Sequence, residues 1–261
     1  MFSRKSKKHK LGLALSGGGA RGFSHLGSAK ALIEAGYQYN IISGTSMGAI
    51  IGCVLADGYS PEEILEMITK TDLKSFVNPH ISSNSFMSMK GARDILERIL
   101  RSKNIEDLKI PFIAVATDIR KGEIHYFTNG NIIDAVIASA SIPVVYEPTI
   151  IDGSVYVDGG VLNNLPVRCI RENCEKVVAF HVNPLGLGLK KGDVKGIPQI
   201  AERTFFLGMR GNILEDKKLC DIFIEHDNLE NYSTFDFIKM KEIYNVGYEN
   251  TKKILSSLQQ S

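Results

Sequence analysis

Features that mark membrane-spanning and secreted proteins are missing from this sequence. No apolar run in the 261 residues approaches the roughly 20 residues that a membrane-spanning helix needs. The basic segment SRKSKKHK precedes the short apolar run LGLAL, but a signal peptide needs an apolar stretch of about 7–15 residues. Because glycines interrupt the run, we interpret it as a first strand and expect a cytoplasmic protein.

Cysteine is scarce, and its spacing excludes two common uses. The four cysteines, Cys53, Cys169, Cys174 and Cys220, form no C-x-x-C pair, and none combines with histidines at the spacing of a zinc site. Free cysteine is among the residue types most often buried in proteins. We therefore expect reduced, buried thiols and no metal site.

The net charge of +2 is small, but the basic residues are concentrated at the N-terminus. The first ten residues include Arg4, Lys5, Lys7, Lys8 and Lys10, so the rest of the chain is slightly acidic. We expect residues 1–10 to form a solvated, disordered arm; peripheral contact with anionic lipid at the inner face of the membrane is the alternative. Basic patches interleaved with aromatic residues are absent elsewhere in the sequence, so we expect no nucleic-acid partner.

Low-complexity segments, internal repeats and linkers are also absent, so we expect residues 11–261 to form a single domain. Apolar runs alternate with helical patterns, which is typical of βαβ units around a largely parallel sheet. Asp152-Gly153 predicts a tight hairpin turn, and Ser60-Pro61 predicts a helix start. The expected strands are 11–15, 39–43, 111–117, 123–128, 176–182 and 221–225, and the expected helices include 24–35, 47–56, 91–101 and 131–140.

Residues 71–90 show neither a helical nor a strand period. They place Phe76, Phe86, Met87 and Met89 among polar residues. Long irregular stretches inside compact domains are often lids or binding loops. A flexible apolar cover and a packed surface loop are both compatible with this composition.

The segment LALSGGGARGFSHLG contains the pattern G-x-G-x-x-G between Gly17 and Gly22. Such a turn binds dinucleotides when an acidic residue follows about 20 residues later, at the end of the next strand. Here the next expected strand runs into Ser43-Gly44-Thr45-Ser46, which contains no Asp or Glu. The missing acidic residue argues against a bound dinucleotide, and we expect no cofactor.

A second motif takes the place of that acidic residue. Residues 44–48, GTSMG, form G-x-S-x-G between an expected strand and an expected helix, which is the context of a nucleophile elbow. A sharp strand-to-helix turn strains the backbone of the nucleophile, and glycine neighbours leave room for it. The hydroxyl of Ser46 would then lie at a helix N-terminus, where the dipole favours negative charge.

The glycine-rich loop can serve this serine. Acyl transfer creates an oxyanion, which needs hydrogen-bond donors close to its position. The consecutive residues Gly17, Gly18 and Gly19 present bare N–H groups for this purpose. The positive charge of Arg21 could stabilise the oxyanion or a substrate phosphate, although a surface ion pair is the alternative for this residue.

Two bases could activate Ser46. The order Ser46, Asp158, His181 fits the triad of an α/β-hydrolase. The other possibility is a dyad, because Asp158 in YVDGG ends an expected strand and two glycines then allow a sharp turn. A buried carboxylate can accept the serine proton without an imidazole, since desolvation raises its pKa.

The motifs GGGARG, GTSMG and VDGG, in this order, resemble the patatin-like phospholipase family. ASASIP (138–143) and VLNNLPV (161–167) extend the resemblance, which runs from about Leu11 to the strand ending near Asn183. The length is similar to that of short single-domain bacterial members. The resemblance implies a three-layer α/β/α fold with a mainly parallel central sheet and a Ser–Asp dyad.

Carried onto this chain, the resemblance makes Ser46 the nucleophile and Asp158 the base. It assigns the oxyanion hole to the N–H groups around Gly17, Gly18 and Gly19, helped by Arg21. The supporting motif positions are Gly22, Gly44, Gly48, Gly159 and Gly160.

The resemblance implies hydrolysis of phospholipid or another fatty-acyl ester, without a metal or cofactor. A phospholipase A or lysophospholipase activity fits this expectation. The alternatives are an acyltransferase or thioesterase that uses the same dyad, or a regulatory protein that acts by binding partners. Residues 71–90 are the candidate cover for the acyl chain.

Overall fold

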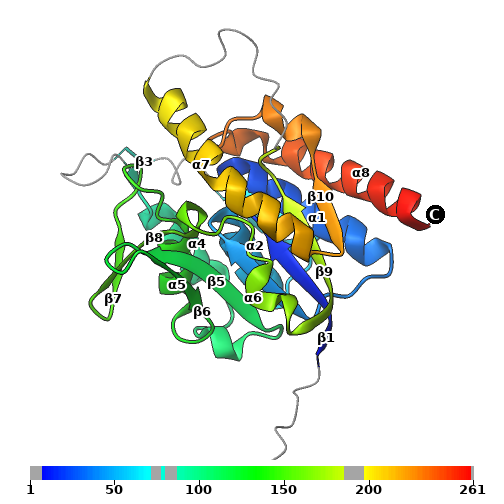
Figure 1. The fold of residues 1–261 in the computed structure, drawn as a ribbon, viewed down its shortest axis with the longest axis horizontal. Coiled ribbons are helices and arrows are strands. Elements are labelled where there is room, and N and C mark those ends of the chain that lie inside the picture. The colour runs from blue at the N-terminus through cyan, green and yellow to red at the C-terminus, as the bar shows by residue number, and fades with distance from the viewer. Residues whose placement is uncertain (1–7, 72–77, 80–86, 185–196, 260–261) are drawn as a thin grey trace, which may run out of the picture.

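A computed structural model describes residues 8–71, 78–79, 87–184 and 197–259 (Figure 1). Its main sheet has eight strands in the described residues, in the order β10-β9-β1-β2-β5-β8-β7, with β6 paired to β5. The strands are β1 (His9–Leu15), β2 (Ile41–Thr45), β5 (Phe112–Asp118), β6 (Glu123–Phe127), β7 (Thr149–Ile151), β8 (Ser154–Asp158), β9 (Cys174–His181) and β10 (Ile222–Glu225).

The sheet is parallel through its centre and antiparallel at one side. β10, β9, β1, β2 and β5 are parallel neighbours, as the alternation of apolar runs and helical patterns predicts. β6 and β8 run antiparallel to β5, and β7 runs antiparallel to β8. The carboxyl ends of the five parallel strands therefore meet at one edge of the sheet, where binding sites of open α/β sheets form.

Helices cover both faces of the sheet. They are α1 (Ser24–Glu34), α2 (Met47–Ala56), α3 (Pro61–Thr69), α4 (Lys90–Ile99), α5 (Ile132–Ala140), α6 (Arg168–Arg171), α7 (Ile197–Leu219) and α8 (Met240–Gln259). In Figure 1, α6 and α7 lie in front of the sheet, and α1, α2, α5 and α8 lie behind it. The expected three-layer α/β/α arrangement with a mainly parallel sheet is confirmed.

Alternation along the strands produces two cores. On β1, Leu13 and Leu15 join the core beneath α1, α2, α5 and α8, whereas Ala14 between them joins the core beneath α6 and α7. Ile41 and Ile42 of β2 divide in the same way. Strands covered on both faces must be apolar throughout, which explains why their runs are continuous rather than alternating.

Local sequence signals define several element boundaries. Ser60 and Glu63 form a reciprocal capping box before α3, with Pro61 at the first helical position. Asp152 and Gly153 have φ values of 48° and 78° between β7 and β8, as a two-residue hairpin turn of type I′ requires. Both predictions are confirmed.

Other expectations are met only in part. The four thiols are free, but only Cys53 and Cys174 are buried, whereas Cys169 and Cys220 are half-buried. β1 already begins at His9, so the last two residues of the expected arm belong to a strand, and residues 1–7 lie outside the described residues. Most of the segment 71–90 also lies outside them, apart from two short paired strands, β3 (Asn78–Pro79) and β4 (Met87–Ser88).

A helix needs roughly 20 predominantly apolar residues to cross a membrane. Within the ranges that the structure describes, no helix is both long and apolar enough to cross a membrane.

α1 and α8 pack at backbone contact distance. A Cβ added to Gly27 of α1 would lie 2.0 Å from the carbonyl oxygen of Tyr244, and one added to Gly247 of α8 would lie 2.1 Å from that of Ser24. Neither helix can therefore accept a side chain at these positions without separating from the other. α1 follows the glycine-rich loop directly, so this contact also fixes the base of that loop.

We expect Gly27→Ala to lower the free energy of unfolding by about 1–3 kcal/mol, because it overpacks the α1–α8 contact. Gly211→Ala in α7 is the matched control, since its Cβ would meet no atom within 4 Å. Alanine there should stabilise the helix by roughly 0.5–1 kcal/mol. Thermal and urea unfolding measure both changes, and equal stability of the two variants would contradict the close packing.

Candidate active site

Ser46 lies in the sharp turn between β2 and α2. Its backbone has φ 56° and ψ −123°, a region in which a residue with a side chain is strained by roughly 1–3 kcal/mol. The surrounding structure holds this conformation: the Ser46 N–H donates to the hydroxyl of Ser139 at 2.9 Å, and that hydroxyl donates to the Val115 carbonyl at 2.5 Å. The strained strand-to-helix turn agrees with the prediction from GTSMG.

The two glycines of GTSMG are required by close packing. A Cβ on Gly44 would lie 2.3 Å from the carbonyl oxygen of Gly48, and a Cβ on Gly48 would lie 2.3 Å from that of Leu15. Two further expected glycines support the same turn. A Cβ on Gly22 would meet the Met47 side chain, and one on Gly159 would meet the Val115 carbonyl at 2.1 Å.

Sheet register brings Asp158 to Ser46. β2 pairs with β5 up to Thr45 opposite Val115, and β8 pairs with β5 from Asp158 opposite Ala116 onward. β6 occupies the other edge of β5 over the same residues, so β2 and β8 share one edge and meet end to end. The last residue of β8 therefore faces the turn that follows β2.

The side chains of Ser46 and Asp158 face each other. The Ser46 hydroxyl acts as a hydrogen-bonding neighbour that lowers the pKa of the Asp158 carboxyl, and the carboxylate accepts the Gly160 N–H at 2.7 Å. Asp158 is only 2% exposed, and burial raises the pKa of its carboxyl to about 6 even though both hydrogen bonds act to lower it. The site therefore contains a hydroxyl paired with a carboxylate that is more basic than an ordinary aspartate.

The segment after Asp158 is tied to both other motifs. Thr45 donates its hydroxyl to the Asn163 carbonyl at 2.9 Å, and Ser43 donates to the Pro166 carbonyl at 2.7 Å. Between them, the Asn164 carbonyl accepts the Gly17 N–H at 3.2 Å. We call residues 163–166 the connecting segment, because it joins the aspartate motif to the serine motif and to the glycine-rich loop.

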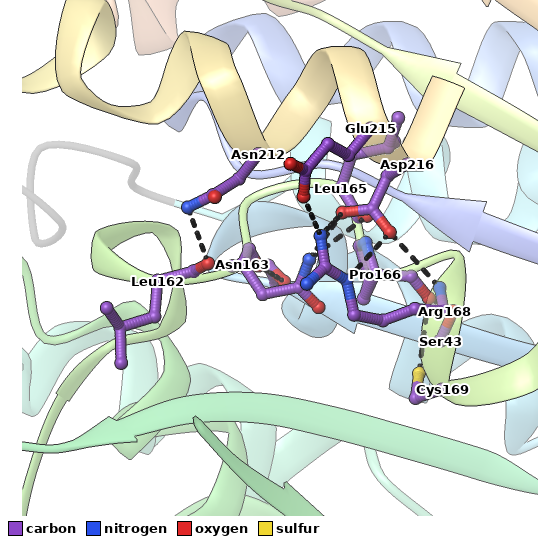
Figure 2. Close-up of polar contacts among 11 residues, drawn as sticks. Ser43, Leu162, Asn163, Leu165, Pro166, Arg168, Cys169, Asn212, Glu215 and Asp216 are labelled. Carbon is purple, nitrogen blue, oxygen red and sulfur yellow. Dashed lines mark hydrogen bonds and ion pairs between the residues drawn. The ribbon is translucent and has the colours of Figure 1, made fainter. Parts of the chain in front are cut away.

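α7 holds the connecting segment from the other side, as Figure 2 shows. Asp216 is fully buried and accepts hydrogen bonds from the Asn163 side chain at 2.7 Å and from the Arg168 guanidinium at 3.1 Å. Asn212 donates to the Leu162 carbonyl at 2.8 Å. A buried carboxylate needs several such partners to remain ionised at low cost, so Asp216 and its neighbours form a connected polar network.

The glycine-rich loop lies against the serine. A Cβ on Gly17 would be 3.0 Å from the Cβ of Ser46, which places this glycine beside the hydroxyl. The Gly17 N–H is occupied by the Asn164 carbonyl. Among the residues that the structure describes, the N–H groups of Gly18 and Gly19 have no hydrogen-bond acceptor.

Arg21 contacts the walls of the loop. Its Nε donates to the Tyr232 carbonyl at 2.8 Å, and its Nη1 donates to Oδ1 of Asn183 at 3.2 Å. The guanidinium carbon also lies 5.8 Å from the centre of the Phe206 ring. These contacts tie the 3-10 turn Gly19–Phe23 to the segments after β9 and β10 and to α7.

The two histidines nearest the motifs, His181 and His25, make other contacts. His181 is fully buried, and its Nδ1 pairs with the carboxylate of Glu225 at 2.7 Å. His25 is also buried, and its Nε2 bonds the Ser16 carbonyl at 2.8 Å. A triad would pair Asp158 with an imidazole, but among the described residues no histidine hydrogen-bonds Asp158.

Sequence reasoning did not assign a role to three residues that complete the site. Ser139 receives the N–H of Ser46, and Asn164 and Asn183 hold the glycine-rich loop. Ser139 lies in ASASIP and Asn164 in VLNNLPV, so these two motifs could have pointed to both residues. Asn183 belongs to no motif, and only the fold brings it to the loop.

An apolar cavity of about 20 Å³ begins at the residue after the serine. It lies between η1 (Gly19–Phe23), α2, α3 and α4, and has room for about one water-sized group. Its lining is apolar throughout: Phe23, Met47, Ile50, Ile51, Val54, Ile64, Ile68, Ile95, Leu96 and Ile99.

Solved structures with this fold include two bacterial proteins. VipD from Legionella pneumophila aligns with a TM-score of 0.60 and 18% identity, covering 96% of this chain and 67% of that one. ExoU from Pseudomonas aeruginosa, in complex with SpcU, aligns with a TM-score of 0.51 and 17% identity, covering 98% of this chain and 54% of that one. Identities this low support the fold alone.

Sequence relatives extend the comparison. An uncharacterized NTE family protein of Mycobacterium tuberculosis is 36% identical over 183 residues, which cover 69% of this chain and 51% of the relative. The mouse patatin-like phospholipase domain-containing protein 7 is 29% identical over 97% of this chain and 21% of its own length. The chain thus spans about half the length of the mycobacterial relative, and less of the mouse protein.

The family model of patatin-like phospholipases matches residues 13–169, more than half of the chain. This range contains the glycine-rich loop, the strained serine turn and the buried aspartate described above. The chain belongs to the patatin-like phospholipase family.

Proposed function

We propose that this chain is a serine acyl-ester hydrolase that acts on phospholipid, lysophospholipid or a related fatty-acyl ester. The observation that carries the proposal is the sheet register that places the strained Ser46 turn beside the buried Asp158 carboxylate, whose pKa the Ser46 hydroxyl lowers. A carboxylate with a pKa near 6 is largely ionised at pH 7, yet it is a better proton acceptor than an exposed aspartate. Membership of the patatin-like phospholipase family supports a lipid substrate.

The reaction proceeds in two halves. Asp158 accepts the proton of Ser46 as the serine oxygen attacks the ester carbonyl, and the N–H groups of Gly18 and Gly19 stabilise the oxyanion. The protonated Asp158 then gives its proton to the departing alcohol. Water attacks the acyl-enzyme with Asp158 again as base, which releases the fatty acid and restores the Ser46 hydroxyl.

The apolar cavity that Met47 lines supports a fatty-acyl substrate. Met47 follows the nucleophile in the chain, and Ile50 and Val54 of α2 also line the cavity. Because its free volume is small, an acyl chain would enter only as side chains change rotamer, and the flexible Met47 can do so readily. We assign the first carbons of the acyl chain to this side of Ser46.

Two related enzymes differ from this proposal in their substrate or in their product. A thioesterase would prefer acyl thioesters, and an acyltransferase would pass the acyl group to an alcohol rather than to water. Incubation of the enzyme with a fatty-acyl ester and glycerol separates these outcomes by the ratio of free acid to transferred acyl product.

We expect Asp158→Asn to abolish hydrolysis while the free energy of unfolding at pH 7 rises by up to roughly 2–3 kcal/mol. Burial raises the pKa of Asp158 from 3.8 to about 6, so the folded state releases this proton less readily than the unfolded state. Stability therefore falls as pH rises between about 4 and 6, and the cost of the buried charge is fully present above that range. Asparagine removes this charge and keeps the shape.

Ester hydrolysis and urea unfolding at pH 7 measure the two effects. The exposed Asp94→Asn is the control, and it should change neither quantity appreciably. Ser46→Ala should likewise eliminate labelling by a fluorophosphonate. Retained hydrolysis in Asp158→Asn would refute the role of Asp158 as base.

The rate of fluorophosphonate labelling should rise with pH and level off, with its midpoint near the Asp158 pKa of about 6. The sign follows from the mechanism, because only the ionised carboxylate can accept the serine proton. His181→Gln should keep the same profile. A midpoint that disappears in His181→Gln would instead support the triad.

Ile50→Phe should reduce kcat/KM for decanoyl esters at least about tenfold more than for acetyl esters, since it fills the cavity one helical turn from Ser46. Ile113→Phe is the matched control, because Ile113 has the same 9% exposure but faces the other core. Nitrophenyl esters of increasing chain length give the comparison. Equal effects on short and long esters would contradict the assignment of the acyl chain.

A further inference from the structure

We propose that Asn183 is a positioning residue that aims the Gly18 N–H at the oxyanion, and that Arg21 acts by holding Asn183. The inference rests on the proposed function, because it assigns roles within the same hydrolytic site. It differs from the expectation that Arg21 stabilises the oxyanion directly.

Asn183 lies two residues after the end of β9 and is held in one orientation. It is 7% exposed, its Nδ2 donates to the Gly17 carbonyl at 2.7 Å, and its Oδ1 accepts Nη1 of Arg21 at 3.2 Å. A flipped amide would place its oxygen against a carbonyl and its N–H group against a guanidinium. The two neighbours therefore fix the amide, with one group donating and one accepting.

Peptide geometry passes this constraint to Gly18. The bond between Gly17 and Gly18 is a planar trans peptide, in which the C=O and the N–H point in opposite directions. Once Asn183 holds the Gly17 carbonyl, the Gly18 N–H must point away from Asn183. That N–H has no acceptor within the described part of the chain, so it remains available to a developing oxyanion.

The preceding peptide, between Ser16 and Gly17, is fixed by different groups. The Ser16 carbonyl bonds Nε2 of His25 at 2.8 Å, and the Gly17 N–H bonds the Asn164 carbonyl at 3.2 Å. Burial lowers the pKa of His25 to about 4, so at neutral pH the ring is uncharged and its Nε2–H donates to Ser16. Gly18 therefore provides the first N–H of the loop that is not already used.

Glycine needs such external support more than any other residue. It has the largest backbone freedom, and a donor that must reorient during the reaction contributes less to catalysis than a fixed one. Val182 also restricts Gly18, because a Cβ on Gly18 would lie 2.4 Å from the Val182 side chain. Asn183 and Val182 thus approach the same glycine from neighbouring positions of one segment.

Asn183→Asp tests the role of the Gly17 contact. Aspartate has the same shape and can still pair with Arg21, but it cannot donate to the Gly17 carbonyl. With nitrophenyl butyrate as substrate, kcat should fall at least about tenfold while KM changes less than about threefold, the pattern for loss of an interaction that matters in the transition state. The rate of fluorophosphonate labelling should fall in parallel.

Asn40→Ala is the matched control at the opposite end of β1. Asn40 also bonds the backbone through its side chain, accepting the Leu11 N–H at 3.2 Å. Its replacement should affect stability but leave kcat unchanged. Unfolding midpoints of both variants establish whether a loss of activity exceeds the loss of folded protein.

A double-mutant cycle separates the two roles of Arg21. If Arg21 acts through Asn183, then Arg21→Met lowers kcat, Arg21→Lys restores part of it, and Arg21→Met adds little once Asn183→Asp is present. Additive effects would mean that Arg21 stabilises the oxyanion independently, and would overturn the inference. If Asn183→Asp is poorly folded, Asn183→Ala takes its place in the cycle, because alanine also removes the donor to the Gly17 carbonyl.

The failure of this inference can be distinguished from the failure of the proposed function. A wild-type chain that neither hydrolyses esters nor reacts with fluorophosphonates overturns both. An active wild type in which Asn183→Asp matches Asn40→Ala in kcat overturns the role of Asn183 alone.

Discussion

The glycine-rich loop, the serine motif and the aspartate motif are held together by the backbone carbonyls of residues 163–166. These carbonyls accept hydrogen bonds from Thr45 and Ser43 of β2 and from Gly17 of the glycine-rich loop. The same segment begins five residues after Asp158, so one short stretch of chain sets the distances among Ser46, Asp158 and the glycine-rich loop. α7 contributes by burying Asp216 against Asn163 and Arg168 (Figure 2), which keeps the segment from moving outward. Residues far from Ser46 in the sequence, such as Asp216, therefore contribute to the geometry of the site.

This framework supports several unfavourable local features. Ser46 has a strained backbone, Asp158 is a buried carboxylate, and two glycine N–H groups lack acceptors among the described residues. Each would be removed by selection for stability alone. Their concentration around one hydroxyl is physically informative, because strain, a raised pKa and free donors are what acyl transfer requires. The parallel sheet provides the stability that offsets them, with strands buried on both faces.

Much of the fold could be predicted from the sequence because its signals are local. The apolar runs became β1, β2, β5 and β9, and Pro61 and Asp152-Gly153 defined a helix start and a hairpin. The Ser46 turn could be predicted from the spacing of the motif, since Gly44 and Gly48 allow a close backbone contact that any side chain would prevent. The contacts of Arg21 and Asn183 could not, because they join residues 162 positions apart through the order of the strands. The antiparallel pairing of β8 with β5, which places Asp158 beside Ser46, could not be predicted either, because it depends on the order of the strands.

Among the described residues no imidazole hydrogen-bonds Asp158, and burial offers a physical reason why the proposed reaction can proceed without one. An exposed aspartate is too weak a base to take a proton from serine at neutral pH, and histidine usually solves this problem in hydrolases. Here desolvation raises the pKa of Asp158 to about 6, close to that of an ordinary imidazole near 6.5. The two glycines after Asp158 make this possible, because Gly159 packs against the Val115 carbonyl and Gly160 donates its N–H to the carboxylate. In the proposed reaction, burial of the aspartate, rather than a third residue, therefore provides the basicity that the proton transfer needs.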